Sequence, residues 1–475
     1  VDHYTVELSL KPGEMPYIGD LQKVRELVDN PEVLPERAVG VSPDILEIGE
    51  YDYLIITTAA LAPVFDSLAG WKESRNALGS IYSNIPAKVV TLEEIKATMG
   101  LWGVPSSHGG TGNDTQTLVR NFIIAAHQEW GVDYVLLGGD DEVVPSRRLW
   151  VPENEGVYEV LGDIYYSGLS GDWDKDGDGT YGEYLGIGND EADMLAEVYV
   201  GRAPVSDISE AWNFVNKTVQ YERAYLDQYA YDLLLVGEKL DNEPTYGDDY
   251  KDEVYDEVLA DEDLDKVTLY ARDGTFSNAN VLREMEAGVH IINHMGHGNP
   301  YYMVGIDQVD AAALENVLPF IVYSQACDAA AFDSGPEYPS DCVAEELVTG
   351  EGGAVAVIGN SRFGWYSPGS TSGSSQKFDL SFFSQVFDDN VTSLGKALSL
   401  SKQELAGLST SGSMRWVYME LNLLGDPETR VLMPERGDHD LAVAEVTSEN
   451  AVMGEECQIS VRVQNLGKSY ELGTV

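Results

Sequence analysis

Val289-His-Ile-Ile-Asn-His-Met-Gly-His297-Gly298 and Phe320-Ile-Val-Tyr-Ser-Gln-Ala-Cys327 are the two stretches of this chain that decide its fold. Each is an apolar run that ends in a reactive side chain beside small residues, a pattern typical of a buried strand in a parallel sheet. In open α/β sheets, the chemistry gathers at the carboxyl ends of such strands. Two adjacent strands of this kind would place His297 and Cys327 side by side at one edge of the sheet.

The combination of His297 and Cys327 predicts nucleophilic chemistry. A cysteine attacks as its thiolate, and a neighbouring histidine is the usual base or imidazolium partner. The tetrahedral intermediate needs hydrogen-bond donors for its oxyanion, and the N–H groups of Gly298 and Cys327 could supply them. Either residue alone would more often be a packed core side chain. The presence of both, each after an apolar strand, favours a cysteine–histidine site.

The motifs around these residues resemble those of the gingipain family, within the caspase-like clan of cysteine peptidases. The resemblance extends from about Tyr51 to about Val431. It rests on the segments Gly296-His297-Gly298, Gln325-Ala326-Cys327, Ala344-Glu345-Glu346-Leu347, Gly353-Ala354-Val355-Ala356-Val357-Ile358, Trp365-Tyr366-Ser367-Pro368 and Gly425-Asp426-Pro427. It implies a caspase-like fold, with Cys327 as the nucleophile and His297 as the general base.

The resemblance also implies a third catalytic group and an acid in the S1 pocket. Glu238 closes an apolar run and resembles the family's acid that contacts the catalytic histidine, although it could be one loop carboxylate among many. Asp249, or Asp248 after a slip of one residue, matches the acid at the floor of the S1 pocket in the arginine-specific members. A carboxylate there would select arginine through a bidentate pair. The alternative is an ordinary cap of a helix that starts near Tyr250.

Trp365 would form a wall of the same pocket by stacking on the substrate, as in the family, unless it is a plain core tryptophan. Shortly after it, Gly369-Ser370-Thr371 stands where some relatives carry a bulky residue, which leaves the depth of the pocket open. Cys342 is a rival nucleophile at the start of a predicted helix. We interpret Cys342 as a packing residue, because no histidine lies near it in sequence and no buried strand precedes it.

A third pattern, Asp172-Trp-Asp-Lys-Asp-Gly-Asp-Gly-Thr-Tyr-Gly-Glu183, matches the calcium-loop template of alternating oxygen ligands. The ligands would be Asp172, Asp174, Asp176, Asp178, Thr180 and Glu183, with Gly177 at the sharp turn. The carbonyl of Asp178 would ligate in place of its side chain. The sequence predicts no flanking EF-hand helices, so we expect a structural calcium ion on another scaffold. The alternative is a solvated acidic turn.

Composition and charge limit the class of partner. The chain has 475 residues, of which 43% are hydrophobic, and a formal net charge of −52. This length allows two or three domains at about 100–200 residues each. The charge argues against nucleic acid and anionic membranes, because phosphate binding needs basic patches. No apolar run reaches the roughly 18 residues of a membrane-spanning helix. The acidity fits a secreted or cell-surface protein, and the family resemblance implies protein or peptide substrates; we expect a monomer.

The cysteines and the first 50 residues bear on disulfide content, targeting and a possible pro-region. The cysteines Cys327, Cys342 and Cys457 are too few and odd in number for a disulfide framework. No signal-peptide pattern follows Val1, so a targeting sequence would lie outside this chain. Residues 1–50 resemble the end of a pro-region, or else form an edge strand with a linker. Cleavage at a basic residue such as Arg37 would be consistent with zymogen activation.

Alternating apolar strands and amphipathic helices predict an α/β fold, with a mostly parallel sheet and helices on both faces. We place a first α/β subdomain with the calcium loop at residues 51–225 and a catalytic caspase-like subdomain at residues 226–435. Between residues 436 and 475 two segments alternate with period two, which predicts the first strands of an immunoglobulin-like β-domain. This region is too short to complete such a sandwich, so we expect the natural protein to continue.

These observations together favour a secreted, calcium-stabilised cysteine endopeptidase. It would cleave after Arg, with Lys second, through a thioester acyl-enzyme. A sorting transpeptidase that uses the same site but passes the acyl group to an amine is the first alternative. The second alternative is a calcium-rigidified surface or adhesion module without activity. The presence of Cys327, His297 and Glu238 argues against this second alternative.

Overall fold

The computed structural model describes residues 46–78, 80, 82–98, 114–153, 156–183, 190–223, 229–243, 245–260, 262, 264–333, 341–433, 441–448 and 459–465. The chain forms two compact units, Val1–Val431 and Leu432–Val475. The predicted N-terminal extension up to residue 45, Arg37 and Cys457 lie outside the described residues.

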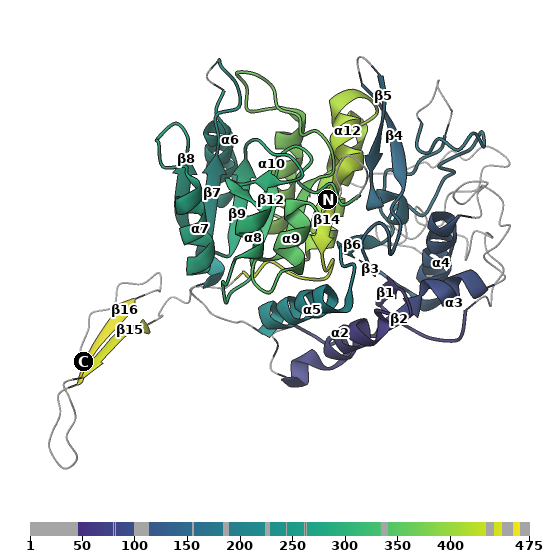
Figure 1. Cartoon of the computed structure of the whole chain (residues 1–475), viewed down its shortest axis with the longest axis horizontal. Coiled ribbons are helices and arrows are strands. Elements are labelled where there is room, and N and C mark those ends of the chain that lie inside the picture. The colour runs from purple at the N-terminus through teal and green to yellow at the C-terminus, as the bar shows by residue number, and fades with distance from the viewer. Residues whose placement is uncertain are drawn as a thin grey trace, which may run out of the picture. The chain divides into compact units, whose positions relative to one another are not determined.

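A ten-stranded sheet forms the centre of the first unit (Figure 1). In sheet order the strands are β2 (Ala87–Thr91), β1 (Tyr53–Thr57), β3 (Tyr134–Gly138), β6 (Tyr199–Ala203), β14 (Leu421–Gly425), β13 (Ala354–Asn360), β12 (Phe320–Ser324), β9 (Ile291–Met295), β7 (Asp232–Gly237) and β8 (Asp265–Tyr270). The strands from β2 to β6 are parallel to one another, as are those from β13 to β8. Strand β14 is antiparallel to β13. The predicted α/β class with a mostly parallel sheet is confirmed.

The sheet is accompanied by helices and short hairpins. The α-helices are α2 (Ala62–Ser74), α3 (Leu92–Ala97), α4 (Thr115–Trp130), α5 (Ile208–Arg223), α6 (Gly247–Val254), α7 (Asn278–Ala287), α8 (Gln308–Ala312), α9 (Val343–Thr349), α10 (Ser374–Phe387), α11 (Leu394–Leu405) and α12 (Gly412–Glu420). Antiparallel pairs are formed by β4 (Arg148–Glu153) with β5 (Gly156–Leu161), and by β10 (Tyr302–Met303) with β11 (Ile306–Asp307). Single helical turns occur at Arg75–Leu78, Asp163–Tyr166, Tyr229–Tyr231, Tyr255–Leu259 and Ala406–Leu408. None of the helices in the described part of the chain is long and apolar enough to cross a membrane.

Helices cover both faces of the catalytic half because successive side chains of a strand point to opposite sides. All five residues of β12 are buried. Val322 shares a core with Leu347 of α9 and Met285 of α7. Tyr323, on the other side, contacts the ring of Phe382 of α10 at a centroid distance of 5.2 Å. A run with two apolar faces, such as β12, therefore needs helices on both faces of the sheet.

The second unit contains an antiparallel pair, β15 (Leu441–Ser448) and β16 (Ile459–Asn465). These strands overlap the two segments whose period-two pattern predicted them. An immunoglobulin-like arrangement is not shown by one pair of strands and stays a prediction. The predicted boundary between residues 225 and 226 also stays a prediction, since β6 and β14 join the two halves into one sheet.

A buried cluster of charges joins α2 and α5 to the segment after β14. Lys72 Nζ lies 2.5 Å from Glu222 Oε1, 2.9 Å from Glu428 Oε2 and 2.9 Å from Asp426 Oδ2. Arg75 Nη1 lies 2.6 Å from Glu428 Oε2, and all five side chains are almost completely buried. Burial by itself would raise the pKa of Glu428, but Lys72 and Arg75 lower it to about 2.

Replacing Glu428 with Gln should lower the free energy of unfolding by about 3–5 kcal/mol at neutral pH, because Lys72 and Arg75 lose a buried anionic partner. A carboxylate whose pKa is depressed in the folded state stabilises the fold above its unfolded pKa. The difference between wild type and Glu428→Gln should therefore shrink as the pH falls from 4.5 toward about 2. Urea unfolding would measure it, with Glu73→Gln on the exposed side of α2 as the control. An equal cost in both variants would contradict the role of the cluster.

Candidate active site

The turn after β12 holds the cysteine at the carboxyl end of the strand, as predicted. Cys327 is partly buried, and its Sγ lies 3.8 Å from the carbonyl oxygen of Gly364. Asp328 has a φ of +53°, a left-handed conformation that aspartate tolerates better than most residues. The Asp328 N–H donates to the carbonyl of Arg362 at 2.7 Å. The turn is therefore held against the segment that follows β13.

The environment of Cys327 keeps the thiol protonated. Burial raises its pKa to about 11, and the carboxylates of Glu420 and Asp328 add to this effect. A thiol with this pKa needs a base to take its proton as it attacks. Cys342 is fully buried at the start of α9, and burial raises its pKa well above the usual range. This burial supports the interpretation of Cys342 as a packing residue.

The turn after β9 brings His297 to the same edge of the sheet. His297 is exposed, and its Nε2 lies 3.2 Å from the carbonyl oxygen of Lys239. A carbonyl can only accept, so Nε2 donates this hydrogen bond, and in the neutral imidazole Nδ1 then keeps its lone pair. A Cβ placed on Gly298 would lie 2.5 Å from Ala326 Cβ and 3.0 Å from the carbonyl oxygen of Cys327. The two predicted turns are therefore in contact, and only a glycine fits at position 298.

The structure differs from the sequence-based expectation for Glu238, which was a contact with His297. Glu238 Oε1 pairs with His294 Nε2 at 3.1 Å instead. The Nδ1 atom of His294 lies 2.9 Å from Ser324 Oγ, and this hydroxyl accepts from the Ala326 N–H at 3.2 Å. Glu238 lies beneath the turn, because a Cβ on Gly296 would stand 2.5 Å from its Oε1. The described partner of the His297 imidazole is a backbone carbonyl, which no sequence pattern could show.

The two candidate S1 acids lie in the first turn of α6, and neither caps the helix, because the N-cap residue is Tyr246. Asp248 is completely buried and accepts from the Arg272 N–H at 2.8 Å. Asp249 is half exposed and forms an ion pair with the Arg272 side chain. The alternative interpretation, in which one of them is an ordinary helix cap, is therefore wrong, while the S1 role stays a prediction. The side chain of Tyr246 is not a capping acceptor, so the helix begins without a side-chain cap.

Helix α6 nevertheless packs beside the segment that carries Trp365. Tyr250 Oη donates to the carbonyl oxygen of Ser367 at 3.2 Å, and Gly369 N–H donates to Thr245 Oγ1 at 2.9 Å. Trp365 is only partly buried, so it is not a plain core residue. The structure thus brings the elements that carry Trp365 and the two acids together, whereas the Asp249 side chain itself is engaged by Arg272.

The predicted calcium loop folds as a tight turn. Carboxylate oxygens of Asp174, Asp176 and Asp178 lie within 4.8 Å of one another, which is close enough for one ion. Gly177 has a φ of +73°, as the glycine of the template requires. Burial, together with neighbouring carboxylates of the loop, raises the pKa of Asp174. A cation would relieve this repulsion.

The remaining predicted ligands stand around the loop, and one further acid was missed. Asp172 and Glu183 are buried, while Thr180 is partly exposed. Asp190 accepts hydrogen bonds from the backbone N–H groups of Lys175, Gly182 and Glu183 at 2.7, 3.0 and 3.0 Å. Burial raises the pKa of Asp190 to about 6, even though these hydrogen bonds lower it. Asp190 stands outside the template's spacing, so no sequence pattern indicated it.

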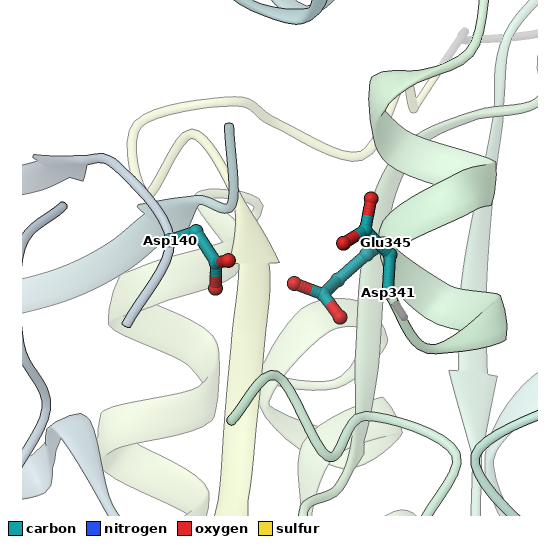
Figure 2. Close-up of side chains that lie close together, drawn as sticks. All are labelled: Asp140, Asp341 and Glu345. Atoms are coloured by element: carbon teal, nitrogen blue, oxygen red, sulfur yellow. The ribbon is translucent and has the colours of Figure 1, made fainter. Parts of the chain in front are cut away.

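A second group of carboxylates, also missed from the sequence, joins the two halves of the sheet. Asp140 follows β3, while Asp341 and Glu345 stand at the start of α9, and Figure 2 shows their carboxylates turned toward one another. The oxygens of these three residues lie within 4.8 Å of one another and could hold a cation. Burial raises the pKa of Asp140 to about 7 and that of Glu345 well above its usual range. Asp140 is too distant in sequence from Glu345 for any spacing rule to find the group.

A chain with an α/β sheet and a cysteine and a histidine turn in contact at one edge has the features of a cysteine peptidase. A model of peptidase family C25 matches residues 48–432, and the chain belongs to this family of cysteine peptidases. The structure of the Arg-specific cysteine proteinase gingipain R (RgpB) is similar, with a TM-score of 0.60, 15% sequence identity and coverage of 86% of this chain and 83% of that one. The complex of the Porphyromonas gingivalis RgpB pro- and mature domains is also similar. Its TM-score is 0.58 and its sequence identity 16%, with coverage of 82% of this chain and 82% of that one. These TM-scores, over more than four-fifths of each chain, show a shared gingipain-like, caspase-like fold. The search of the curated proteins found no match.

Calcium should raise the Tm of the wild-type protein more than that of Asp174→Asn, because this variant loses a central carboxylate of the loop. The difference should shrink as the pH falls, because protonation of the loop carboxylates opposes cation binding, and burial already raises the pKa of Asp174. Thermal unfolding with calcium and with a chelator would measure both effects. Asp66→Asn, an exposed change of equal charge on α2, is the control. An undiminished calcium shift in Asp174→Asn would contradict the assignment of the loop.

Proposed function

We propose that this C25 peptidase is a calcium-stabilised endopeptidase in which Cys327 attacks the scissile carbonyl and His297 moves the proton. The observation that supports it most strongly is the contact of Gly298 with Ala326 and Cys327, which joins the two reactive turns. The attack forms a tetrahedral intermediate and then a thioester, with loss of the amine. Water then hydrolyses the thioester and restores the free thiol.

The hydrogen bonds and the pKa of the thiol support a general-base route for the first step. The thiol, with a pKa of about 11, is protonated before substrate binds. The proton would pass to Nδ1 of His297, because Nε2 donates to the carbonyl of Lys239. It would next be delivered to the leaving amine. The N–H groups of Gly298 and Cys327 have no acceptor on another residue in the described part of the chain, so they remain available to an oxyanion.

Glu238 enters this proposal as a positioning residue. It would act through His294 and Ser324 on the Ala326 N–H, and thus on the turn that carries the nucleophile. A fully hydrogen-bonded buried network of this kind makes a turn rigid. This role replaces the direct contact with His297 that the sequence predicted.

For specificity, we propose a preference for Arg, and Lys second, at P1. Asp249 is the candidate acid, Asp248 the alternative and Trp365 the wall of the pocket. The support is the resemblance to the arginine-specific members and the packing of α6 beside the Trp365 segment. A substrate guanidinium would take the place of Arg272 on Asp249, which is half exposed and therefore reachable. Such an exchange of one arginine for another preserves the ion pair on Asp249.

The wider setting of the protein is also proposed from the sequence. The loop at Asp172–Glu183 would hold a calcium ion. The protein would be secreted or displayed at the cell surface and would act as a monomer. These proposals fit the net charge of −52. Activation of a zymogen by cleavage near Arg37 and an immunoglobulin-like fold around β15 and β16 complete the proposal.

Cys327→Ala and His297→Ala should each lower kcat for a fluorogenic peptide at least about 1000-fold, as loss of nucleophile or base does in other triad and dyad enzymes. The assay would use peptides with Arg, Lys, Asp or Leu at P1, with calcium and after controlled proteolysis of the N-terminal segment. Cys342→Ala, which keeps both reactive turns, is the control. Activity retained by Cys327→Ala would refute the assignment. Conversion of the peptide only when an amine is added would favour the transpeptidase alternative.

Asp249→Asn should raise the KM for peptides with Arg at P1 about tenfold or more, because the substrate guanidinium loses its carboxylate partner. Asp252→Asn is a matched control, since Asp252 also pairs with Arg272, through Oδ2 at 3.0 Å from Nη2. Steady-state kinetics on Arg and Leu peptides would separate the two variants. An equal change of KM in both would show that Asp249 acts only through Arg272. The same experiment on Asp248→Asn would assign the acid if Asp248 takes this role.

A further inference from the structure

An exposed aromatic ring stands directly beside the candidate nucleophile. Phe363 is 50% exposed, and its two sequence neighbours both contact the cysteine turn. The carbonyl of Arg362 accepts from the Asp328 N–H at 2.7 Å, and the carbonyl oxygen of Gly364 lies 3.8 Å from Cys327 Sγ. The backbone of Phe363 is therefore fixed between two contacts to the turn on which catalysis would occur.

The ring of Phe363 has one covered face and one open face. It stacks on Trp416 with a centroid distance of 6.1 Å and an interplanar angle of 2°. Trp416 is almost completely buried, and Trp365 contacts it edge-on at 5.9 Å and 78°. Half of the Phe363 surface remains accessible, so its second face can receive another apolar group.

The position of Phe363 does not depend on burial of its own ring. The Arg362 N–H donates to Glu420 Oε2 at 2.8 Å, and the Arg362 side chain pairs with Asp333 at 2.7 Å. A Cβ on Gly364 would lie 2.2 Å from the carbonyl oxygen of Gln325, so the segment runs tightly along the cysteine turn. The scaffold holds this aromatic side chain out toward solvent at the candidate active site.

We propose that Phe363 is a specificity-determining residue that stacks with an aromatic or large apolar side chain of the peptide substrate, close to the scissile bond. This inference rests on the proposed function, with Cys327 as the nucleophile. A peptide whose carbonyl reaches Cys327 must pass beside the contacts at Arg362 and Gly364. One of its side chains then meets the open face of Phe363. This subsite is separate from the acid of the S1 pocket, which α6 carries.

Stacking of one further aromatic ring predicts an effect of moderate size. An aromatic pair contributes about 0.5–1.5 kcal/mol beyond simple burial, which corresponds to roughly a two- to twelvefold change in kcat/KM. Because the ring contacts the substrate and not the reacting atoms, the effect should lie mainly in KM.

The test uses the full chain with calcium and peptides that keep Arg at P1 and carry Phe, Leu or Ser in turn at P3, P2, P1′ and P2′. At one position, wild type should prefer Phe over Ser by roughly two- to twelvefold. Phe363→Ser should abolish this preference and leave the other positions unchanged. The control is Val317→Ser, a 73% exposed apolar residue before the amino end of β12. Persistence of the preference in Phe363→Ser, or its absence from wild type, would overturn the inference.

A second measurement separates this inference from the proposed function. Iodoacetamide alkylation of Cys327, followed by mass spectrometry of its peptide, reports occupancy of the site by a peptide whether or not that peptide is hydrolysed. A Phe-containing peptide should slow alkylation in wild type and in Val317→Ser, but not in Phe363→Ser. Protection that depends on Phe363 in a protein without hydrolytic activity would support the subsite while refuting the peptidase proposal. Hydrolysis that needs Cys327, with protection independent of Phe363, would refute the subsite alone.

Discussion

The parallel pairing of β9 with β12 is the constraint on which the site depends. The register places His294 opposite Ser324, and the two side chains are hydrogen bonded at 2.9 Å. Both strands therefore end at the same level, and their turns leave the sheet together. Gly298 lets the backbone of one turn touch the other, since any side chain there would collide with Ala326 and Cys327. A shift of one residue in this register would turn these side chains to the opposite face.

Burial decides the protonation state of the thiol at this edge. The thiol of Cys327 is partly desolvated beside Glu420 and Asp328, and its pKa of about 11 leaves it neutral without a base. Beneath it, Glu238, His294 and Ser324 satisfy one another's hydrogen bonds at 3.1 and 2.9 Å. Burying such a network costs little free energy when its members are all hydrogen bonded. A single unpaired polar group in the interior would destabilise the fold. The reactive turn is thus supported from below by polar groups and flanked by aromatic rings.

Carboxylates occur in two different kinds of cluster in this chain. At the charge cluster of Lys72 and Arg75, buried cations hold the pKa of Glu428 at about 2. Carboxylates face one another at the loop of Asp174 and at the group around Asp140, and burial raises the pKa of Asp174 and of Asp140. The first arrangement is complete with protein groups alone. The second kind would gain from a cation, because a positive ion would reduce the repulsion among the facing carboxylates.

The sequence by itself determined the α/β class, the buried strands β9 and β12, and the adjacency of the turns of His297 and Cys327. These features depend on the local hydrophobic pattern, which can be read from one sequence, and on the general geometry of parallel sheets. The positive φ of Gly177 was likewise readable, because the calcium-loop template places a glycine at this position of one short segment.

Only the tertiary structure decided which partners the polar groups choose. Glu238 pairs with His294 because that side chain points inward from β9, and Lys239 offers its carbonyl to His297. Arg272 engages Asp249, and Asp140 meets Glu345, across distances in sequence that no motif spans. Phe363 likewise became a candidate substrate contact only because the fold stacks it on Trp416 and places its neighbour Gly364 against Cys327. Pattern along a chain specifies which face is buried, but a hydrogen bond needs two atoms to meet in space.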